Sequence, residues 1–304
     1  MKKKILMITL SNHTSFQDGV FSMYENLKGR YEVSTLTIAG SSYPVSQDKN
    51  NYFVDAPLRP GITKGTFNFK EIHRMMKIIR KVDFDTVYFE SFHIWNYPVI
   101  MYLKLHGIKY SHAINDVIPH EGDPHAKING MINGLTAKLA DRIILRSSDG
   151  LNNAEKLYPK YKNKLHKVDL WYSFPQYCPP KGNTILFFGR MNRYKGIDCL
   201  LELVKRTPDL QYVVAGKADD SVGDTVKELR KMPNVKLDEG VIPYDKMHDY
   251  FYNARCTILP YETATQSGVV LDAYKHSRPA VAFDVGALGE QIDDGVTGYL
   301  AKPG

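Results

Sequence analysis

Short apolar runs rich in β-branched and aromatic residues alternate along the chain with segments whose apolar residues recur at spacings of three and four. This alternation predicts strands separated by helices, as in parallel α/β sheets. In the first half, strands are expected at Lys4–Leu10, Tyr31–Ile38, Thr86–Glu90, Tyr110–Ile114 and Arg142–Leu145. Helical stripes are expected at Ile72, Met75, Met76 and Ile79, and at Ile128, Met131, Ile132, Leu135 and Leu139.

A second series of strands and helices follows residues 171–183, where several prolines and little periodicity predict a linker. We therefore expect an N-terminal domain over residues 1–170 and a C-terminal domain over residues 184–304. The strands expected in the second domain are Thr184–Phe188, Gln211–Ala215, Val235–Leu237, Cys256–Leu259 and Ala280–Phe283. Its helices are expected at Ile197–Arg206, Ser221–Lys231, Tyr244–Asn253, Gly268–Ser277 and Gly289–Asp293. Neither domain carries a G-x-G-x-x-G fingerprint, which argues against a standard nicotinamide enzyme.

Composition is that of an ordinary globular protein, with 43% hydrophobic and 24% charged residues among 304, so disordered and fibrous classes are excluded. The three cysteines show no C-x-x-C spacing, which favours a reducing compartment without a disulfide framework. The basic start at Met1–Lys4 imitates a signal peptide, but its apolar run ends at Ser11, before an h-region is complete. No apolar run approaches the roughly 20 residues of a membrane span. We expect a cytoplasmic protein.

Positive charge is concentrated in the first half of the chain. Residues 1–170 hold 24 Lys and Arg against 16 Asp and Glu, whereas the remainder holds 16 against 17. A basic domain suits nucleic acid, anionic lipid or a phosphorylated substrate, and charge alone does not choose among them. No zinc finger, RNP-type aromatic stretch or basic zipper accompanies the charge, so no nucleic-acid partner is expected. The segment Lys70–Lys81 has a basic face opposite its apolar stripe, which predicts either a solvated surface or contact with anionic lipid headgroups.

Two stretches of the second domain carry candidate chemistry. In Phe187–Gly196, a strand ends in Gly189-Arg190, and Lys195-Gly196 opens the next helix, so two cations and free helix amides could hold a diphosphate. A solvated loop is the alternative. In Leu259–Tyr274, a polar loop carries Glu262, and Ser267-Gly268 opens a helix whose first amides point toward any nearby anion. Asp272 lies four residues after Gly268, where its carboxylate could accept hydrogen bonds from a ribose; an ordinary first-turn acid is the alternative.

These stretches stand in one order with further short pieces: Val213–Gly216, Arg278-Pro279, Asp284–Glu290 and Gly295–Leu300. Together they resemble the nucleotide-sugar-binding half of the family 4 retaining glycosyltransferases, also called glycosyl transferases group 1. The resemblance covers residues 184–304 closely and the first half loosely. It implies the GT-B fold, an α/β architecture of two Rossmann-like, doubly wound domains that face a cleft, the first binding the acceptor and the second the nucleotide sugar.

The first half adds one motif to the resemblance, from His112 to Asp123. It is similar to the family's strand-end segment near the transferred sugar, but Asn115 stands where many members have histidine. An amide can hydrogen-bond a sugar hydroxyl but cannot shuttle a proton, and His120 is the candidate replacement. As a zinc set, His106, His112, His120 and His125 lack the expected tight spacing, so no metal is expected.

The resemblance also implies roles for individual residues. Catalysis would involve Arg190, Lys195, Glu262, His120 and Asn115, the two cations stabilising the leaving diphosphate and the other three orienting the donor sugar or acceptor. Donor binding would involve Gly189, Arg190, Lys195, Gln266, Ser267, Gly268, Val269, Val270 and Asp272. The family commonly pairs two glutamates at a spacing of eight. Here Asp272 takes the second place and Ala264 the first, with Glu262 two residues early.

The resemblance implies a retaining glycosyltransferase that moves a sugar from a UDP- or GDP-sugar to a hydroxyl of a saccharide or lipid-linked oligosaccharide. The pathway implied is the assembly of cell-surface polysaccharide, lipopolysaccharide or capsule. No cofactor or metal is implied, and contact with the inner face of an anionic membrane fits the basic domain. Two alternatives remain: a sugar-nucleotide epimerase, and a non-catalytic sugar-nucleotide-binding or assembly protein. The family continues past Gly304 with closing helices, so the resemblance predicts a truncated second domain or a different domain packing.

Overall fold

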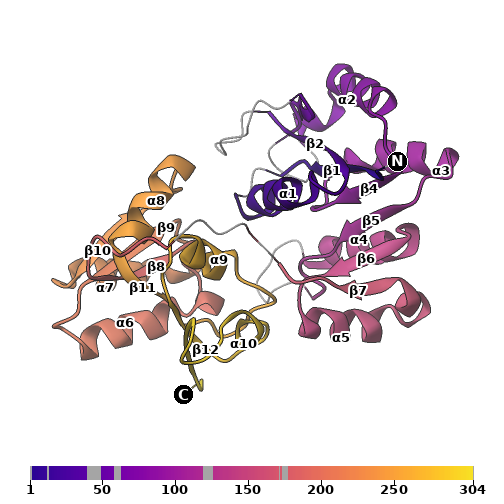
Figure 1. The fold of residues 1–304 in the computed structure, drawn as a ribbon. Coiled ribbons are helices and arrows are strands. Elements are labelled where there is room, and N and C mark those ends of the chain that lie inside the picture. The colour runs from indigo at the N-terminus through magenta and orange to yellow at the C-terminus, as the bar shows by residue number, and fades with distance from the viewer. Residues whose placement is uncertain are drawn as a thin grey trace. The chain divides into compact units, whose positions relative to one another are not determined.

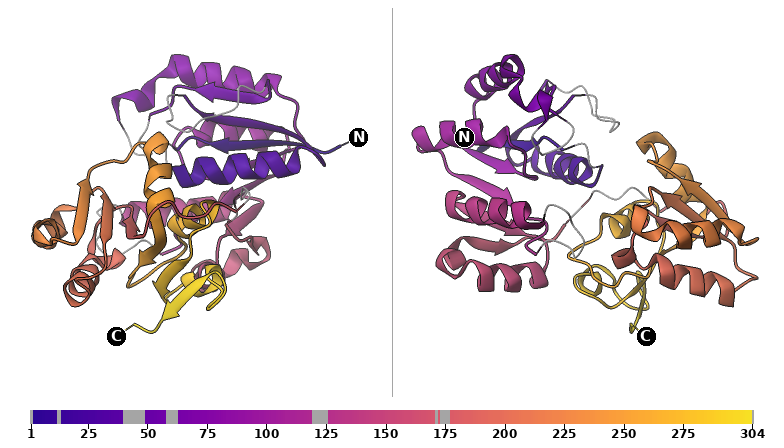
Figure 2. Two further views of the ribbon diagram at one scale, coloured as in Figure 1. Left: turned by 60° about the vertical axis from the view of Figure 1, so that its left-hand side comes forward. Right: turned by 180° about the vertical axis from the view of Figure 1, so that it is seen from behind.

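A computed structural model describes residues 2–11, 14–39, 49–57, 63–118, 126–170, 172 and 177–303. The chain divides into two compact units, Met1–Ser173 and Phe174–Gly304. Each unit is a parallel β-sheet with helices packed against it (Figure 1, Figure 2). The predicted α/β class with two Rossmann-like sheets is therefore confirmed.

Unit 1 contains a seven-stranded sheet in the order β3-β2-β1-β4-β5-β6-β7. Its strands are β1 (Lys4–Thr9), β2 (Glu32–Ile38), β3 (Asn51–Val54), β4 (Thr86–Phe89), β5 (Tyr110–Ala113), β6 (Arg142–Leu145) and β7 (Leu165–Lys167). Its helices are α1 (Thr14–Leu27), α2 (Phe69–Lys81), α3 (Asn96–Leu105), α4 (Ala126–Leu139) and α5 (Ser148–Leu157), with short 3₁₀ helices η1 (Lys64–Phe67) and η2 (Pro159–Lys164). The five predicted strands are confirmed to within one residue at each end.

The two helical stripes predicted in unit 1 differ in what they pack against. On α2, Met75 and Ile79 are 0% and 1% exposed and join the core formed with the strands. The stripe of α4 does not do so, because Ile128 and Met131 are 57% and 77% exposed. Helix α4 contributes Ala137 to the core instead. Periodicity thus predicted the α4 helix correctly, but the face that it buries is not the apolar stripe.

Unit 2 contains a six-stranded parallel sheet in the order β10-β9-β8-β11-β12-β13. Its strands are β8 (Thr184–Phe188), β9 (Tyr212–Gly216), β10 (Val235–Glu239), β11 (Ala254–Leu259), β12 (Ala280–Phe283) and β13 (Gly298–Ala301). Its helices are α6 (Ile197–Arg206), α7 (Gly223–Lys231), α8 (Tyr244–Asn253), α9 (Gly268–Lys275) and α10 (Leu288–Gln291), with the 3₁₀ helices η3 (Arg193–Lys195) and η4 (Asp220–Val222). All five predicted strands and five predicted helices of this unit are present; β8, β12, α6 and α8 have the predicted bounds, and the others have shifted ends.

The end of α9 illustrates one such shift. The prediction placed the helix end at Ser277, but Ser277 adopts a left-handed φ of 57° and the helix ends at Lys275. The Arg278 amide then donates to the Ala273 carbonyl at 2.8 Å, the six-to-one bond of a Schellman ending. The buried Arg278 guanidinium donates to the carbonyls of Phe251, Cys178 and Pro179. This arginine therefore joins the start of unit 2 to helix α8.

Both sheets have a switch point, where the chain leaves the first strand on one side and returns on the other. These points lie between β1 and β4 in unit 1 and between β8 and β11 in unit 2. Ligands of open parallel sheets bind outside the carboxyl ends of the strands at such points. In the described part of the chain, no helix has the length and hydropathy needed to cross a bilayer.

Candidate functional site

The loops that follow β8 and β11 pack against each other at the switch point of unit 2. Gly196 ends η3 with a φ of 70°, and a Cβ atom built on it would lie 1.7 Å from the Pro260 carbonyl oxygen. Only glycine fits there, because a side chain would require both a strained backbone and a displaced neighbour. The amide of Glu262 donates to the Tyr194 carbonyl at 2.8 Å. Two loops that are far apart in sequence thus form one surface.

Lys195 is held on this surface by groups without negative charge. Its Nζ donates to the Tyr261 hydroxyl at 2.8 Å and lies 4.0 Å from the centroid of the Tyr261 ring. The Asn192 side chain accepts from the Lys195 amide at 3.1 Å and caps η3. Arg190 is exposed at the end of β8. Both predicted cations therefore follow the carboxyl end of the same strand.

The first turn of α9 faces the end of β8. A Cβ atom built on Gly189 would lie 3.8 Å from Cγ2 of Val269, so the backbones of the two segments approach closely. Ser267 occupies the N-cap position of α9 and is 3% exposed. Its Oγ has no hydrogen-bond partner among the described residues. The Gly268, Val269 and Val270 amides open the helix, and the positive end of the helix dipole adds to the charge of Lys195.

Gln291, at the end of α10, fixes the position of this N-cap residue. Its Oε1 accepts from the Ser267 amide at 2.8 Å, and its Nε2 donates to the Ser267 carbonyl at 3.1 Å. One primary amide thus binds both backbone polar groups of a buried residue. The loop after β12 joins the same surface, since the Ala287 amide donates to the Ala264 carbonyl at 2.9 Å. The Ser267 amide is therefore engaged within the protein, which leaves the next three amides to face a ligand.

The remaining predicted donor-binding residues lie on the same two segments. Asp272 sits one turn into α9 and is 5% exposed, while Gln266 is half-buried in the preceding loop. Val270 contributes its side chain to the core, so only its backbone faces outward. Glu262 is exposed and lies near Cys199 of α6. The pKa of the Cys199 thiol is raised mainly by burial and to a lesser extent by the charge of Glu262. The residues predicted to bind the donor thus lie on the β8 loop and on the segment that opens α9, while Glu262 lies near Cys199 of α6.

Of the two residues predicted in unit 1, the structure describes only Asn115, near the end of β4. Asn115 follows β5, and its Nδ2 donates to the Glu90 carbonyl at 3.1 Å. His120 lies outside the described residues. The sequence analysis did not single out the buried ion pair beside Asn115, in which Arg146 Nη2 and Glu90 Oε2 are 2.5 Å apart with side chains 3% and 0% exposed. The Tyr88 hydroxyl bonds both partners, and burial together with the Glu90 carboxylate raises the pKa of Tyr88 well above its ordinary value.

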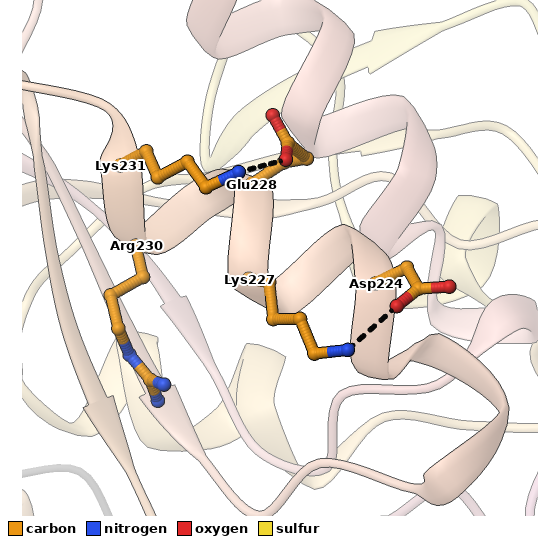
Figure 3. Close-up of a pocket in the computed structure, with 5 residues that line it drawn as sticks. All are labelled: Asp224, Lys227, Glu228, Arg230 and Lys231. Carbon is orange, nitrogen blue, oxygen red and sulfur yellow. Dashed lines mark hydrogen bonds and ion pairs between the residues drawn. The ribbon is translucent and has the colours of Figure 1, made fainter.

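Among the residues that the structure describes, no cluster of His, Cys, Asp and Glu has the geometry to hold a metal ion. His112 is buried on β5, where its ring stacks on Phe89 and its Nδ1 lies 2.7 Å from the Ala113 carbonyl. A hollow on α7 is lined by charged side chains that pair along the helix, Lys227 with Asp224 and Lys231 with Glu228 (Figure 3). Pairs of this kind are typical of a solvated helix surface, not of a reactive site.

Comparison with known proteins agrees with this geometry. Residues 182–304 match the family model described as glycosyl transferases group 1. The match spans the whole sheet of unit 2, from β8 to β13. An uncharacterized 41.2 kDa protein in the cps region of Klebsiella pneumoniae is 27% identical over 156 residues, which are 51% of this chain and 39% of that relative. The chain thus matches less than half the length of this relative.

Solved glycosyltransferase structures resemble the chain over nearly its whole length. Sucrose-phosphate synthase from Thermosynechococcus elongatus has a TM-score of 0.70 at 15% identity, covering 99% of this chain and 86% of that one. Anabaena HepE, solved in complex with UDP and glucose, has a TM-score of 0.67 at 15% identity with the same coverage. These similarities establish the GT-B glycosyltransferase fold that the resemblance implied.

The sequence analysis missed Tyr261, Gln291, Glu90 and Arg146. It also missed Asn192, although this residue has a local signal: an asparagine three residues before Lys195 has the spacing of an N-cap. The partners of the other four are 24 to 66 residues away along the chain. No local pattern marks such pairs.

Proposed function

We propose that the chain is a retaining glycosyltransferase that moves a sugar from a nucleoside diphosphate sugar, a UDP- or GDP-sugar, to a hydroxyl of a saccharide or lipid-linked acceptor. One arrangement carries the proposal: at the switch point of unit 2, Lys195 is held by Tyr261, in the loop that leads from β11 to the buried Ser267 and the N-terminus of α9. A cation and free helix amides on one loop surface fit a diphosphate.

The reaction requires stabilisation of the charge that develops on the leaving diphosphate. In the proposed mechanism, Lys195 and Arg190 approach the phosphates from the β8 loop, and the Gly268–Val270 amides bind them from α9. Because Lys195 and the start of α9 are fixed before the substrate arrives, little reorganisation of these groups is needed in the transition state. Their charge supports transfer without a metal ion. Asp272 would bind the ribose, and Glu262, Gln266, Asn115 and His120 would orient the donor sugar or acceptor.

The acceptor and the pathway form a further part of the proposal. A relative encoded in a capsule region supports assembly of a cell-surface polysaccharide, and the UDP and glucose in the HepE complex support a nucleotide-sugar donor. The basic first half of the chain suits an acceptor linked to lipid diphosphate. We accordingly place the protein in the cytoplasm, at the periphery of the inner membrane face.

Thermal unfolding with UDP, GDP, ADP and their sugars tests the donor site. Ligand at about 100 times its dissociation constant should stabilise the folded state by about 2.7 kcal/mol. Lys195→Ala should abolish this shift and lower turnover by orders of magnitude while the unliganded protein keeps its fold. Lys205→Ala, an exposed α6 lysine paired with Glu202, is the control. Equal shifts in the Lys195 variant and its parent would remove Lys195 from the site.

A further inference from the structure

Apart from Phe69 in the first turn, the exposed side chains of α2 are all basic. They are Lys70, His73, Arg74, Lys77, Arg80 and Lys81. With 100° of rotation per residue, these positions fall within one continuous arc of roughly 120°. The opposite side of the helix is buried in the core of unit 1 through Met75 and Ile79. The helix is therefore fixed with its basic face outward.

Two phenylalanine rings continue this face at its N-terminal end. Phe67 and Phe69 are 60% and 74% exposed, although neighbouring Thr66 is only 5% exposed. Hydrogen bonds fix the segment: the Trp95 indole donates to the Thr66 carbonyl at 2.9 Å, and the Thr66 hydroxyl accepts from the Thr63 amide at 2.8 Å. The rings thus project from an ordered turn. Two adjacent exposed rings on such a turn indicate a surface that binds apolar material.

The charge on this surface is almost uncompensated. Between Thr63 and Val82 the only acidic residue is Glu71, which pairs with Arg74 at 3.2 Å. Within the described ranges, Lys64, Lys70 and Lys77 pair with no carboxylate. Paired cations elsewhere, such as Lys227 with Asp224 on α7, contrast with this arrangement.

The aromatic end of the surface lies at the ligand-binding edge of unit 1. Helix α2 precedes β4 in a parallel sheet, so its N-terminus lies near the carboxyl ends of the strands. Trp95, which holds η1, follows β4 by a few residues and precedes α3. Binding through Phe67 and Phe69 would therefore bring the carboxyl edge of β4, where Glu90 and Ser91 lie, toward the bound surface.

We propose that the α2 patch, defined as Lys64, Phe67, Phe69, Lys70, Arg74, Lys77, Arg80 and Lys81, docks on an anionic lipid bilayer. The cations attract acidic headgroups, and the two rings insert at the level of the headgroups. A straight helix face with its rings at one end fits a planar surface. The docking rests on this surface alone. Its consequence, delivery of a lipid-linked acceptor to the carboxyl edge of unit 1, rests on the proposed function.

Vesicle flotation of the full chain tests the proposal. The vesicles contain phosphatidylcholine alone or with 30% phosphatidylglycerol, at low and high salt. We expect binding only to the anionic vesicles and a marked decrease at high salt. Lys70→Ala/Lys77→Ala should weaken the partition coefficient by about 25-fold, since each charge contributes about fivefold. Phe67→Ser/Phe69→Ser should weaken binding by about tenfold or more and make the remainder more salt-sensitive.

The matched control is Lys227→Ala/Lys231→Ala on α7, which removes the same charge from unit 2 (Figure 3). It should bind vesicles like the parent. Equal weakening in the control and patch variants would overturn the proposal, as would absent binding at low salt. The proposal would also be overturned, in favour of a nucleic-acid surface, if the protein bound single-stranded RNA more tightly than vesicles and the phenylalanine variant lost RNA binding to the same extent as vesicle binding. Nucleotide-induced thermal shifts, measured in parallel, report separately on the proposed function and on folding of each variant.

Discussion

Gln291 is expected to be essential for the α9 N-terminus, although it has no counterpart in the motifs that first indicated the site. Gln291→Leu keeps the approximate size of the side chain and removes both polar atoms. The Ser267 amide and carbonyl, which are bound at 2.8 and 3.1 Å, would lose their partners. The change therefore affects the geometry of the site without removing a charge.

The magnitude follows from the burial of Ser267, which is 3% exposed. A buried polar group left without a partner costs about 1–3 kcal/mol. Two such groups, partly rehydrated through the half-buried position of Gln291, should cost about 3 kcal/mol in unfolding free energy. For a unit of this size, that corresponds to a decrease in Tm of about 10 °C. Displacement of the helix start should also weaken nucleotide binding by about tenfold or more.

Thermal unfolding with and without nucleotide measures both effects. Gln211→Leu is the control, because it makes the same chemical change at an exposed position. Gln291→Glu separates the two hydrogen bonds: its carboxylate can still accept from the Ser267 amide but cannot donate to the carbonyl. It should be intermediate in stability and weaker than the parent in nucleotide binding, because a negative charge then stands beside the phosphate site. A Gln291→Leu protein with the Tm and nucleotide affinity of the parent would refute this reasoning.

Three further predictions concern buried ionisable groups. Arg146→Met leaves Glu90 charged and buried without its cation, which should cost about 3–5 kcal/mol in urea unfolding; adding Glu90→Gln should recover more than half. Burial lowers the pKa of His112 to about 4. Between pH 6.5 and 4 the unfolded chain therefore binds more protons at this residue than the folded protein does. The free energy of unfolding should decrease as the pH falls through this range, by up to about 1.4 kcal/mol per pH unit. Asp272→Asn should weaken nucleotide binding in thermal-shift titrations.

Each of these predictions has a result that contradicts it. A double variant at positions 90 and 146 that is no more stable than Arg146→Met would show that the charge of Glu90 is not the source of the loss. For His112→Gln, a stability profile between pH 4 and 7 as steep as that of the parent would place the acid sensitivity elsewhere. Unchanged nucleotide affinity in Asp272→Asn would restrict that residue to packing in the first turn of α9.

The sequence predicted central strands well because their signal is local. Apolar runs such as Lys4–Thr9 lie in the centre of a parallel sheet, where the last four residues of this strand are buried. The edge strands β3 and β7 were missed: Asn51–Val54 and Leu165–Lys167 are only four and three residues long, and two of the three residues of β7 are polar and exposed. On α4 the periodicity gave the helix but not its packing, because tertiary contacts through Ala137 decide which face is buried.

The residues of the candidate site also differ in how far they could be predicted from the sequence. Gly196, Lys195 and Gly268 lie in short motifs whose spacing places a turn, a cation and a helix start, so local chemistry was sufficient to find them. The partners that fix these groups are remote: Tyr261 lies 66 residues from Lys195, and Gln291 lies 24 residues from Ser267. Such pairings form only when loops from different strands meet at the switch point, and a single sequence carries no pattern for them.

The two partly or fully buried cations at the two switch points differ in what compensates their charge. Arg146 lies 2.5 Å from the Glu90 carboxylate, so its charge is neutralised within the protein and little remains for a ligand. Lys195 is held by a phenol hydroxyl and an aromatic face, which orient the ammonium while leaving its charge uncompensated. An anion entering unit 2 therefore gains the full attraction of a cation already in position, whereas one approaching Arg146 would have to displace a buried carboxylate. This difference, more than the presence of a basic residue, favours the proposed phosphate-binding role of unit 2.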